Sequence, residues 1–292
     1  MPAGKIEIGP IQWWQWPTVL SLDAPAVALL WQAELSRAAG VTLPGTPVIV
    51  LGSSVWLAYV ADRWIEGWRL APDSVRTQRH RFYRRWRWPT AALWVAVLSA
   101  DLVAALTGLS RPGLAAGLAL LVAVATYLLS HQLVHRNRSW RVPKEICVAG
   151  LLCAGVALFP AVRPEADLPG LTVPAALFAL LCFANCALIS TWEHAVDRSH
   201  GQTSFSLQFR HGARISRTLP WMAAGVAMAV AAAAGGPVRI AALCACSGGG
   251  LLGIVDLFQE RLGWRLARIL GDVALMTPAV PLAAVLFGGL RA

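Results

Sequence analysis

Nine runs of about 20 mostly apolar residues divide this chain, and they constrain its fold more than any other feature. A run of that length spans a bilayer as an α-helix, because helical hydrogen bonding satisfies every backbone polar group in lipid. The runs lie near 16–36, 44–64, 89–108, 112–133, 145–162, 172–193, 218–235, 238–257 and 267–290. We therefore predict an all-α, polytopic membrane bundle of about nine transmembrane helices, forming one domain over residues 1–292.

The basic residues are distributed unevenly between the connections of these runs. If the N-terminus lies in the cytoplasm, 20 of the 25 Lys and Arg residues fall on the cytoplasmic side. The opposite side then holds Arg37, Arg111, Arg163, Arg239 and Arg291. Because basic loops stay in the cytoplasm, we expect a multi-pass protein of a bacterial inner membrane with a cytoplasmic N-terminus. Residues 1–15 are expected to lie at the interface, and 67–88 and 198–217 to form cytoplasmic loops.

The net charge of +10 raises the question of an anionic partner. The run RTQRHRFYRRWRW, from Arg76 to Trp88, interleaves basic and aromatic side chains, a pattern also found in nucleic-acid-binding surfaces. The positive-inside bias, together with Trp and Tyr at the headgroup level, explains the same run without nucleic acid. We therefore expect this loop to meet membrane lipid and no nucleic acid.

Two pairs of acidic residues are the main candidates for a functional site in the sequence. Asp62 with Glu66, and Glu193 with Asp197, each stand at the expected cytoplasmic end of an apolar run. Residues four apart on a helix lie on the same face, so each pair projects two carboxylates together. Charged groups beside hydrocarbon are costly and mark functional sites. Since carboxylate oxygens suit Mg²⁺, the four acids are predicted to hold this metal.

Ordinary salt bridges at the helix ends are the alternative explanation for these acids. The pairings would then be Asp62 with Arg63 or Arg69, and Asp197 with Arg198 or His194. The repetition of the arrangement, with a long basic loop after each acidic pair, favours a shared cation site between two related halves of the bundle.

The acidic pairs resemble the two Asp-rich motifs of the UbiA-type intramembrane prenyltransferases. Members of that family have nine helices, with a motif at the cytoplasmic end of the second and of the sixth. Asp62-Arg63-Trp64-Ile65-Glu66 is similar to the last part of the family's Asn-Asp-x-x-Asp-x-x-x-Asp motif. Glu193-x-x-x-Asp197-Arg198-x-x-Gly201-x-Thr203 is similar to the second motif.

Further pieces are similar to the family in the same order, over most of the chain. They are Leu20-Ser21-Leu22-Asp23-Ala24-Pro25, Arg76-Thr77, Tyr127, the basic stretch from His135 to Glu145, and Arg268-x-x-Gly-Asp272 followed by Pro278. The chain departs from the family where Ala58 and Tyr59 replace Asn-Asp, and where Glu66 and Glu193 replace Asp.

The resemblance implies an enzyme that ionises an isoprenoid diphosphate and transfers the prenyl group to an apolar or aromatic, lipophilic acceptor. It implies Mg²⁺ held by Asp62, Glu66, Glu193 and Asp197, with Asp62 and Asp197 as the catalytic acids. Candidate contacts to the diphosphate are Arg136, Arg138, Lys144, Arg198 and Tyr59. Two other functions are open on the same fold. One is a terpene cyclase, in which the cation is quenched within the prenyl chain instead of by an acceptor. The other is a non-catalytic lipid-binding or transport protein.

Overall fold

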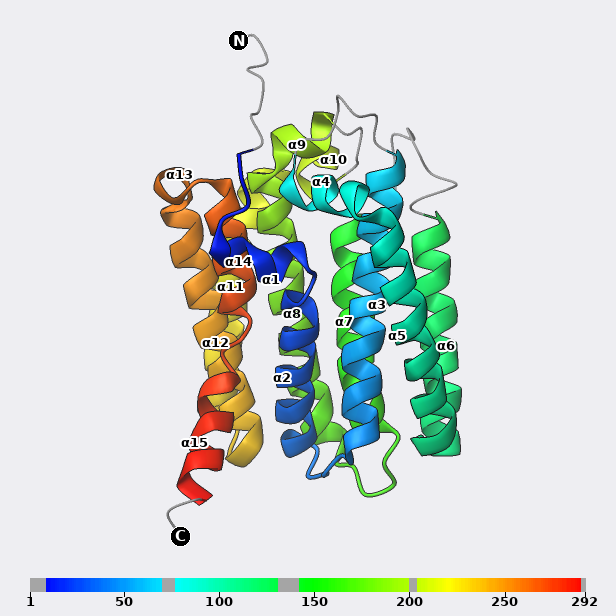
Figure 1. The fold of residues 1–292 in the computed structure, drawn as a ribbon. Helices are drawn as coiled ribbons and strands as arrows, with labels where there is room; N and C mark the ends of the chain where they lie inside the picture. Colours follow the sequence, from blue (N-terminus) through cyan, green and yellow to red (C-terminus); the bar gives the residue numbers. More distant parts are fainter. Residues whose placement is uncertain (1–8, 70–76, 131–141, 200–203, 290–292) are drawn as a thin grey trace.

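The computed structural model describes residues 9–69, 77–130, 142–199 and 204–289, and the long helices run side by side with short helices across one end (Figure 1). All regular structure in these residues is helical. The elements are η1 (Trp13–Gln15), α1 (Trp16–Val19), α2 (Asp23–Ala38), α3 (Gly45–Arg69), α4 (Gln78–Arg85), α5 (Arg87–Gly108), α6 (Arg111–Leu129), α7 (Lys144–Ala161), α8 (Leu168–Trp192), α9 (His194–Ser199), α10 (Phe205–Gln208), α11 (Gly212–Ala233), α12 (Gly236–Leu257), α13 (Gln259–Leu262), α14 (Trp264–Ala274) and α15 (Ala279–Gly289).

Seven helices of the described residues are long and apolar enough to cross a membrane, namely α3, α5, α6, α7, α8, α11 and α12. The bent pair α14 and α15 adds an eighth crossing if it is counted as one span. The predicted class, an all-α multi-pass membrane protein, is thereby confirmed. Helix α2 lies in the first predicted span but has only 16 residues, so the count of nine crossings stays a prediction.

The last predicted span, 267–290, is not the single straight helix that its hydropathy suggested. Helices α14 and α15 meet at an angle of 43° across a short break. Pro278 lies in this break, and proline cannot donate the backbone hydrogen bond that a continuous helix needs. The indole of Trp31 donates a hydrogen bond of 2.8 Å to the carbonyl oxygen of Leu275, which the break would otherwise leave unpaired.

Helix α8 is the centre of the bundle, because it contacts α2, α7, α11, α12 and α14. Half of its most apolar stretch is buried, and its Phe178 stacks on Trp31 with the ring centroids 4.7 Å apart. In contrast, none of the most apolar stretch of α5 is buried, and Leu102 and Val103 are exposed. In a membrane this apolar surface of α5 faces lipid.

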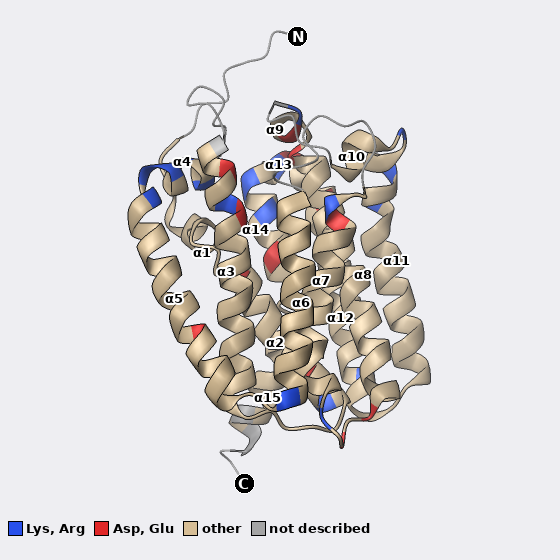
Figure 2. Ribbon diagram, turned by 90° about the vertical axis from the view of Figure 1, so that its right-hand side faces the viewer, with Lys and Arg blue, Asp and Glu red and all other residues tan. Residues whose placement is uncertain are grey.

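Charged side chains gather at one end of the bundle, around α4, α9, α10 and α13 (Figure 2). We call this end the basic end. The described chain begins there and finishes with α15 at the opposite end (Figure 1). Helices α3 and α8 both run toward the basic end, so the two acidic pairs lie at the same end of the molecule.

A strained turn joins α1 to α2 at the basic end. Ser21 has a φ of 60°, in the left-handed region that residues other than glycine rarely adopt. Its buried hydroxyl lies 2.9 Å from the hydroxyl of Tyr83 and accepts a hydrogen bond of 2.6 Å from Arg63. Strain of this kind persists where the surrounding contacts over-determine it, which is common beside functional sites.

Close packing of α12 on α11 gives the first testable prediction. A Cβ atom at Gly249 would lie 2.8 Å from the carbonyl oxygen of Pro220 and 2.9 Å from the nitrogen of Ala224, whereas one at Gly250 would meet nothing within 4 Å. We expect Gly249→Ala to lower the free energy of unfolding by about 1–3 kcal/mol, because backbone must move apart. Gly250→Ala should leave it unchanged or raise it slightly. Thermal unfolding in detergent measures both, and equal effects would contradict the packing described.

Candidate functional site

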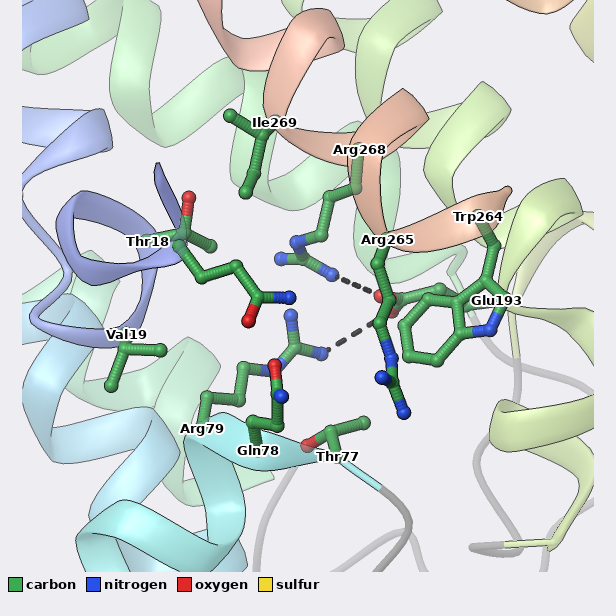
Figure 3. Close-up of a pocket in the computed structure, with 11 residues that line it drawn as sticks. Thr18, Val19, Thr77, Gln78, Arg79, Glu193, Trp264, Arg265, Arg268 and Ile269 are labelled. Atoms are coloured by element: carbon green, nitrogen blue, oxygen red, sulfur yellow. Dashed lines mark hydrogen bonds and ion pairs between the residues drawn. The ribbon is translucent and has the colours of Figure 1, made fainter. Parts of the chain in front are cut away.

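A buried carboxylate held by two arginines is the most prominent feature of the basic end. Glu193, the residue after α8, is 4% exposed. It accepts a hydrogen bond of 2.7 Å from Arg268 of α14 and one of 3.3 Å from Arg79 of α4 (Figure 3). Burial alone would raise the pKa of Glu193, but the charges of Arg268 and Arg79 outweigh it and hold the pKa at about 2. We call these three residues the arginine clamp.

A small pocket opens beside the arginine clamp, between α1, α4 and α14 (Figure 3). The residues that line it are Gln15, Thr18, Val19, Thr77, Gln78, Arg79, Glu193, Trp264, Arg265, Arg268 and Ile269. Three arginines face one glutamate in this set, so the pocket is positively charged overall. Within the described residues, the Nε atoms of Arg79 and Arg268 are buried and have no hydrogen-bond partner. These unpaired donors belong to two of the arginines that line the pocket.

Helix α4 owes its position to a chain of polar contacts. Thr77 caps the helix by accepting a hydrogen bond from the backbone N–H of His80, and its hydroxyl lies 2.6 Å from Nδ1 of the same histidine. Nε2 of His80 lies 2.8 Å from a carboxylate oxygen of Glu66 at the end of α3. Since His80 is only 1% exposed, this contact fixes α4 against α3 and places Arg79 over Glu193.

The second acidic pair spans the junction of α8 and α9. The backbone N–H of Asp197 donates to the carbonyl oxygen of Glu193, so the two residues are one turn apart across this junction. Asp197 is buried, and its carboxylate lies 3.7 Å from the amine of Lys144 at the start of α7. Lys144 also interacts electrostatically with Glu66 and Glu193, so three of the four predicted acids lie around this amine.

The other predicted site residues are placed less centrally. Asp62 is half-buried on α3 and interacts with Tyr127 of α6. Tyr59 lies one turn deeper on α3, with the guanidinium of Arg63 5.6 Å from its ring centroid. Arg198 is exposed on α9. Arg136 and Arg138 lie outside the described residues.

The acids do not form a ready metal site in the part of the chain that the structure describes. No group of three or more His, Cys, Asp or Glu side chains lies close enough there to hold a metal ion. Glu66, Glu193 and Asp197 are instead paired with His80, with two arginines and with Lys144, respectively. Each would have to leave its basic partner before binding metal, so this arrangement does not fit Mg²⁺ as it stands. The assignment of Mg²⁺ to these acids stays a prediction.

Comparison with known proteins identifies the architecture. No protein-family model matches the chain, and no curated protein matches it significantly. Among solved structures, it is similar to the apo structure of a UbiA homolog from Aeropyrum pernix K1, with a TM-score of 0.57 and 17% sequence identity. The match covers 91% of this chain and 98% of that one. This chain has the UbiA-type fold. The structural match establishes the shared fold, which the motifs had predicted. Because the sequence identity is low, the activity has to be argued from the site.

The arginines of the clamp were not among the site residues predicted from the sequence. Arg79 and Arg268 had been counted with the charges that orient the chain in the membrane. A signal was present for Arg268, since it opens the segment Arg268-x-x-Gly-Asp272 that resembles the UbiA-type ninth helix. For Arg79 the signal was weaker, because four other arginines lie between positions 80 and 88.

The ionisation of Glu193 predicts how stability responds to acid. Because its pKa of about 2 lies below the ordinary value of 4.5, its charged form stabilises the fold fully above 4.5, and this contribution is lost as the pH falls toward 2. The melting temperature of the wild type should therefore fall more steeply between about pH 5 and about pH 3 than that of Glu193→Gln. The exposed Glu165, changed to Gln, is the control and should follow the wild type. Equal slopes in all three proteins would contradict the clamp.

Proposed function

We propose that this protein is an intramembrane prenyltransferase that binds an isoprenoid diphosphate at the basic end and transfers its prenyl group to a lipophilic acceptor. One observation carries the proposal. A pocket with three arginines, two of which have an unpaired Nε donor, lies at the basic end of an apolar bundle of UbiA-type fold. A molecule that fits both parts has an anionic head and a long apolar tail. On this proposal the basic end faces the cytoplasm of a bacterial cell.

The arginine clamp supplies the main catalytic effect in this proposal. When the bond between C1 of the prenyl group and the diphosphate oxygen breaks, the electron pair leaves with the diphosphate. Guanidinium groups that are already fixed stabilise this charge without reorganisation, because Arg79 and Arg268 are positioned by Glu193 before substrate arrives. Arginine suits the task since its planar fork donates two parallel hydrogen bonds to phosphate oxygens.

The apolar bundle below the pocket then protects the allylic cation. Lipid-facing and buried side chains exclude water from the reacting carbon, and the acceptor forms a bond to C1 while it loses a proton. Lys144 and Arg198 remain proposed contacts for the outer phosphate, together with Arg136 and Arg138, which lie outside the described residues.

Binding of farnesyl diphosphate to the purified protein tests the role of the arginines. Arg79→Gln and Arg268→Gln each remove a charge-assisted contact, so the dissociation constant should rise by at least about tenfold. Arg239→Gln, at the opposite end of the bundle, is the matched control and should bind as the wild type does. Calorimetry in nanodiscs measures all four proteins. Unchanged binding in both clamp variants would contradict the proposed diphosphate site.

Glu193→Gln separates the clamp from a metal site. In EDTA, removal of the competing carboxylate leaves both guanidinium groups to the diphosphate, so we expect this variant to bind farnesyl diphosphate at least as tightly as the wild type. Loss of a Mg²⁺-dependent part of binding in the same variant would instead identify Glu193 as the metal ligand that the sequence predicts.

Turnover of radiolabelled isoprenoid diphosphates, with Mg²⁺ or with EDTA, distinguishes the three functions that the fold permits. Transfer to an added phenol supports the prenyltransferase. A labelled cyclic hydrocarbon without acceptor would show a terpene cyclase. Tight binding without release of diphosphate, over a broad set of prenyl lengths and acceptors, would show a non-catalytic lipid-binding protein.

A further inference from the structure

Two carboxyl groups lie together beneath the pocket. Asp23 is the first residue of α2 and is 6% exposed, and its side chain lies within hydrogen-bonding reach of that of Asp272 on α14. A carboxylate can only accept, so a hydrogen bond between two carboxyl groups requires one of them to be protonated and to donate. A pair that shares one proton in this way carries one negative charge, and it can take up one further proton.

The pair is held in place by groups from three helices. Arg63 of α3 and Arg268 of α14 act electrostatically on Asp23. Asn185 of α8 donates a hydrogen bond of 3.0 Å to Asp272. The other titratable groups that face the pair are Tyr59 of α3, Tyr83 of α4, and Cys182 and Cys186 of α8. From α12, Asp256 is directed elsewhere, to Trp192 and Arg217.

A glycine makes the contact with Asn185 possible. A Cβ atom at Gly271 would lie 2.7 Å from Oδ1 of Asn185. Glycine at this position therefore lets the amide pass close to the backbone of α14 and reach Asp272. The positions of Asn185 and Gly271 are thus matched to the orientation of one carboxyl group.

Asp272 is also placed at a defined depth relative to the arginine clamp. It lies four residues after Arg268 on α14, and therefore on the same face and about 6 Å further along the helix. Because α14 runs from the basic end toward α15, Asp272 lies deeper in the bundle than the pocket (Figure 1). Tyr59 of α3 interacts electrostatically with Cys186 of α8 and with Asp272, so groups from three helices converge here.

We propose that the Asp23–Asp272 pair is the proton acceptor of the transfer reaction. This inference rests on the proposed function. A diphosphate bound by Arg268 would direct the first carbon of its tail toward Asp272. As the bond from C1 to the diphosphate oxygen breaks, the acceptor forms a bond to C1 and loses one proton. The singly charged pair takes up this proton and becomes neutral, and later returns it to water.

The shared proton can be tested without knowledge of the acceptor. Infrared difference spectroscopy at neutral pH, in H₂O and in D₂O, should show a protonated carboxyl C=O stretch in the wild type that is absent from Asp272→Asn. Asp101→Asn is the matched control, since Asp101 lies within the membrane on α5, where its oxygens accept hydrogen bonds from Ser53 and Ser54. An unaltered spectrum in Asp272→Asn would overturn the shared proton and with it the inference.

The fate of the prenyl group tests the role in transfer. With farnesyl diphosphate and a panel of alkylphenols, Asp272→Asn and Asp23→Asn should bind the diphosphate within a few-fold of the wild type, while the rate of transfer falls by about a hundredfold or more. In the wild type, the rate of transfer should fall at acid pH. The residual transfer rate of Asp272→Asn should not show this fall. Asp101→Asn should transfer as the wild type does.

Three results would contradict the proposal, and they are distinguishable. Transfer and pH profile unchanged in Asp272→Asn would exclude the pair as the proton acceptor. Equal loss of diphosphate binding and transfer would show that the pair only positions Arg268. Absence of any transfer product from the wild type would overturn the proposed function itself, on which this inference depends.

Discussion

The ion pairing of Glu193 with Arg79 and Arg268 is the contact on which the rest of the basic end depends. A buried carboxylate without partners would be strongly destabilising, and two buried guanidinium groups without an anion would be equally so. The clamp therefore joins three segments that are far apart in sequence: the end of α8, the start of α4 and the middle of α14. The pocket exists because these three segments are held at this distance from one another.

The same contact gives the site a way to respond to an anion. Glu193 occupies the donors that a diphosphate would use, and the two Nε atoms remain unpartnered within the described residues. The pocket already holds more positive than negative charge. A diphosphate that replaces or joins the carboxylate of Glu193 therefore adds negative charge where it is attracted. Glu193 was predicted from the sequence to be a metal ligand. In this structure it holds Arg79 and Arg268 in position.

Hydropathy predicted the helices well where a helix is apolar to its ends. The run 89–108 corresponds to α5, Arg87–Gly108, and 238–257 corresponds to α12, Gly236–Leu257. It was less accurate for α11, which begins at Gly212, six residues before the predicted run, because Arg214 and Arg217 lie within the helix. The break between α14 and α15 was missed because hydropathy does not register the backbone effect of Pro278.

The acids were found from the sequence because they are rare and repeat with helical spacing. Their partners were not, since Arg79 is separated from Glu193 by 114 residues and Arg268 by 75. A one-dimensional pattern cannot show which of many basic residues meets a given acid after folding. The Asp23–Asp272 pair was hidden for the same reason, although both residues lie in segments that resemble the UbiA-type family.

A structure of the protein with farnesyl thiodiphosphate, an analogue that resists cleavage, tests the central claim most directly. The account predicts diphosphate oxygens against Arg79 and Arg268, with Glu193 turned away from at least one of them and the farnesyl tail descending past Asp272. A diphosphate bound away from the pocket, with the clamp of Glu193 intact, would contradict the account.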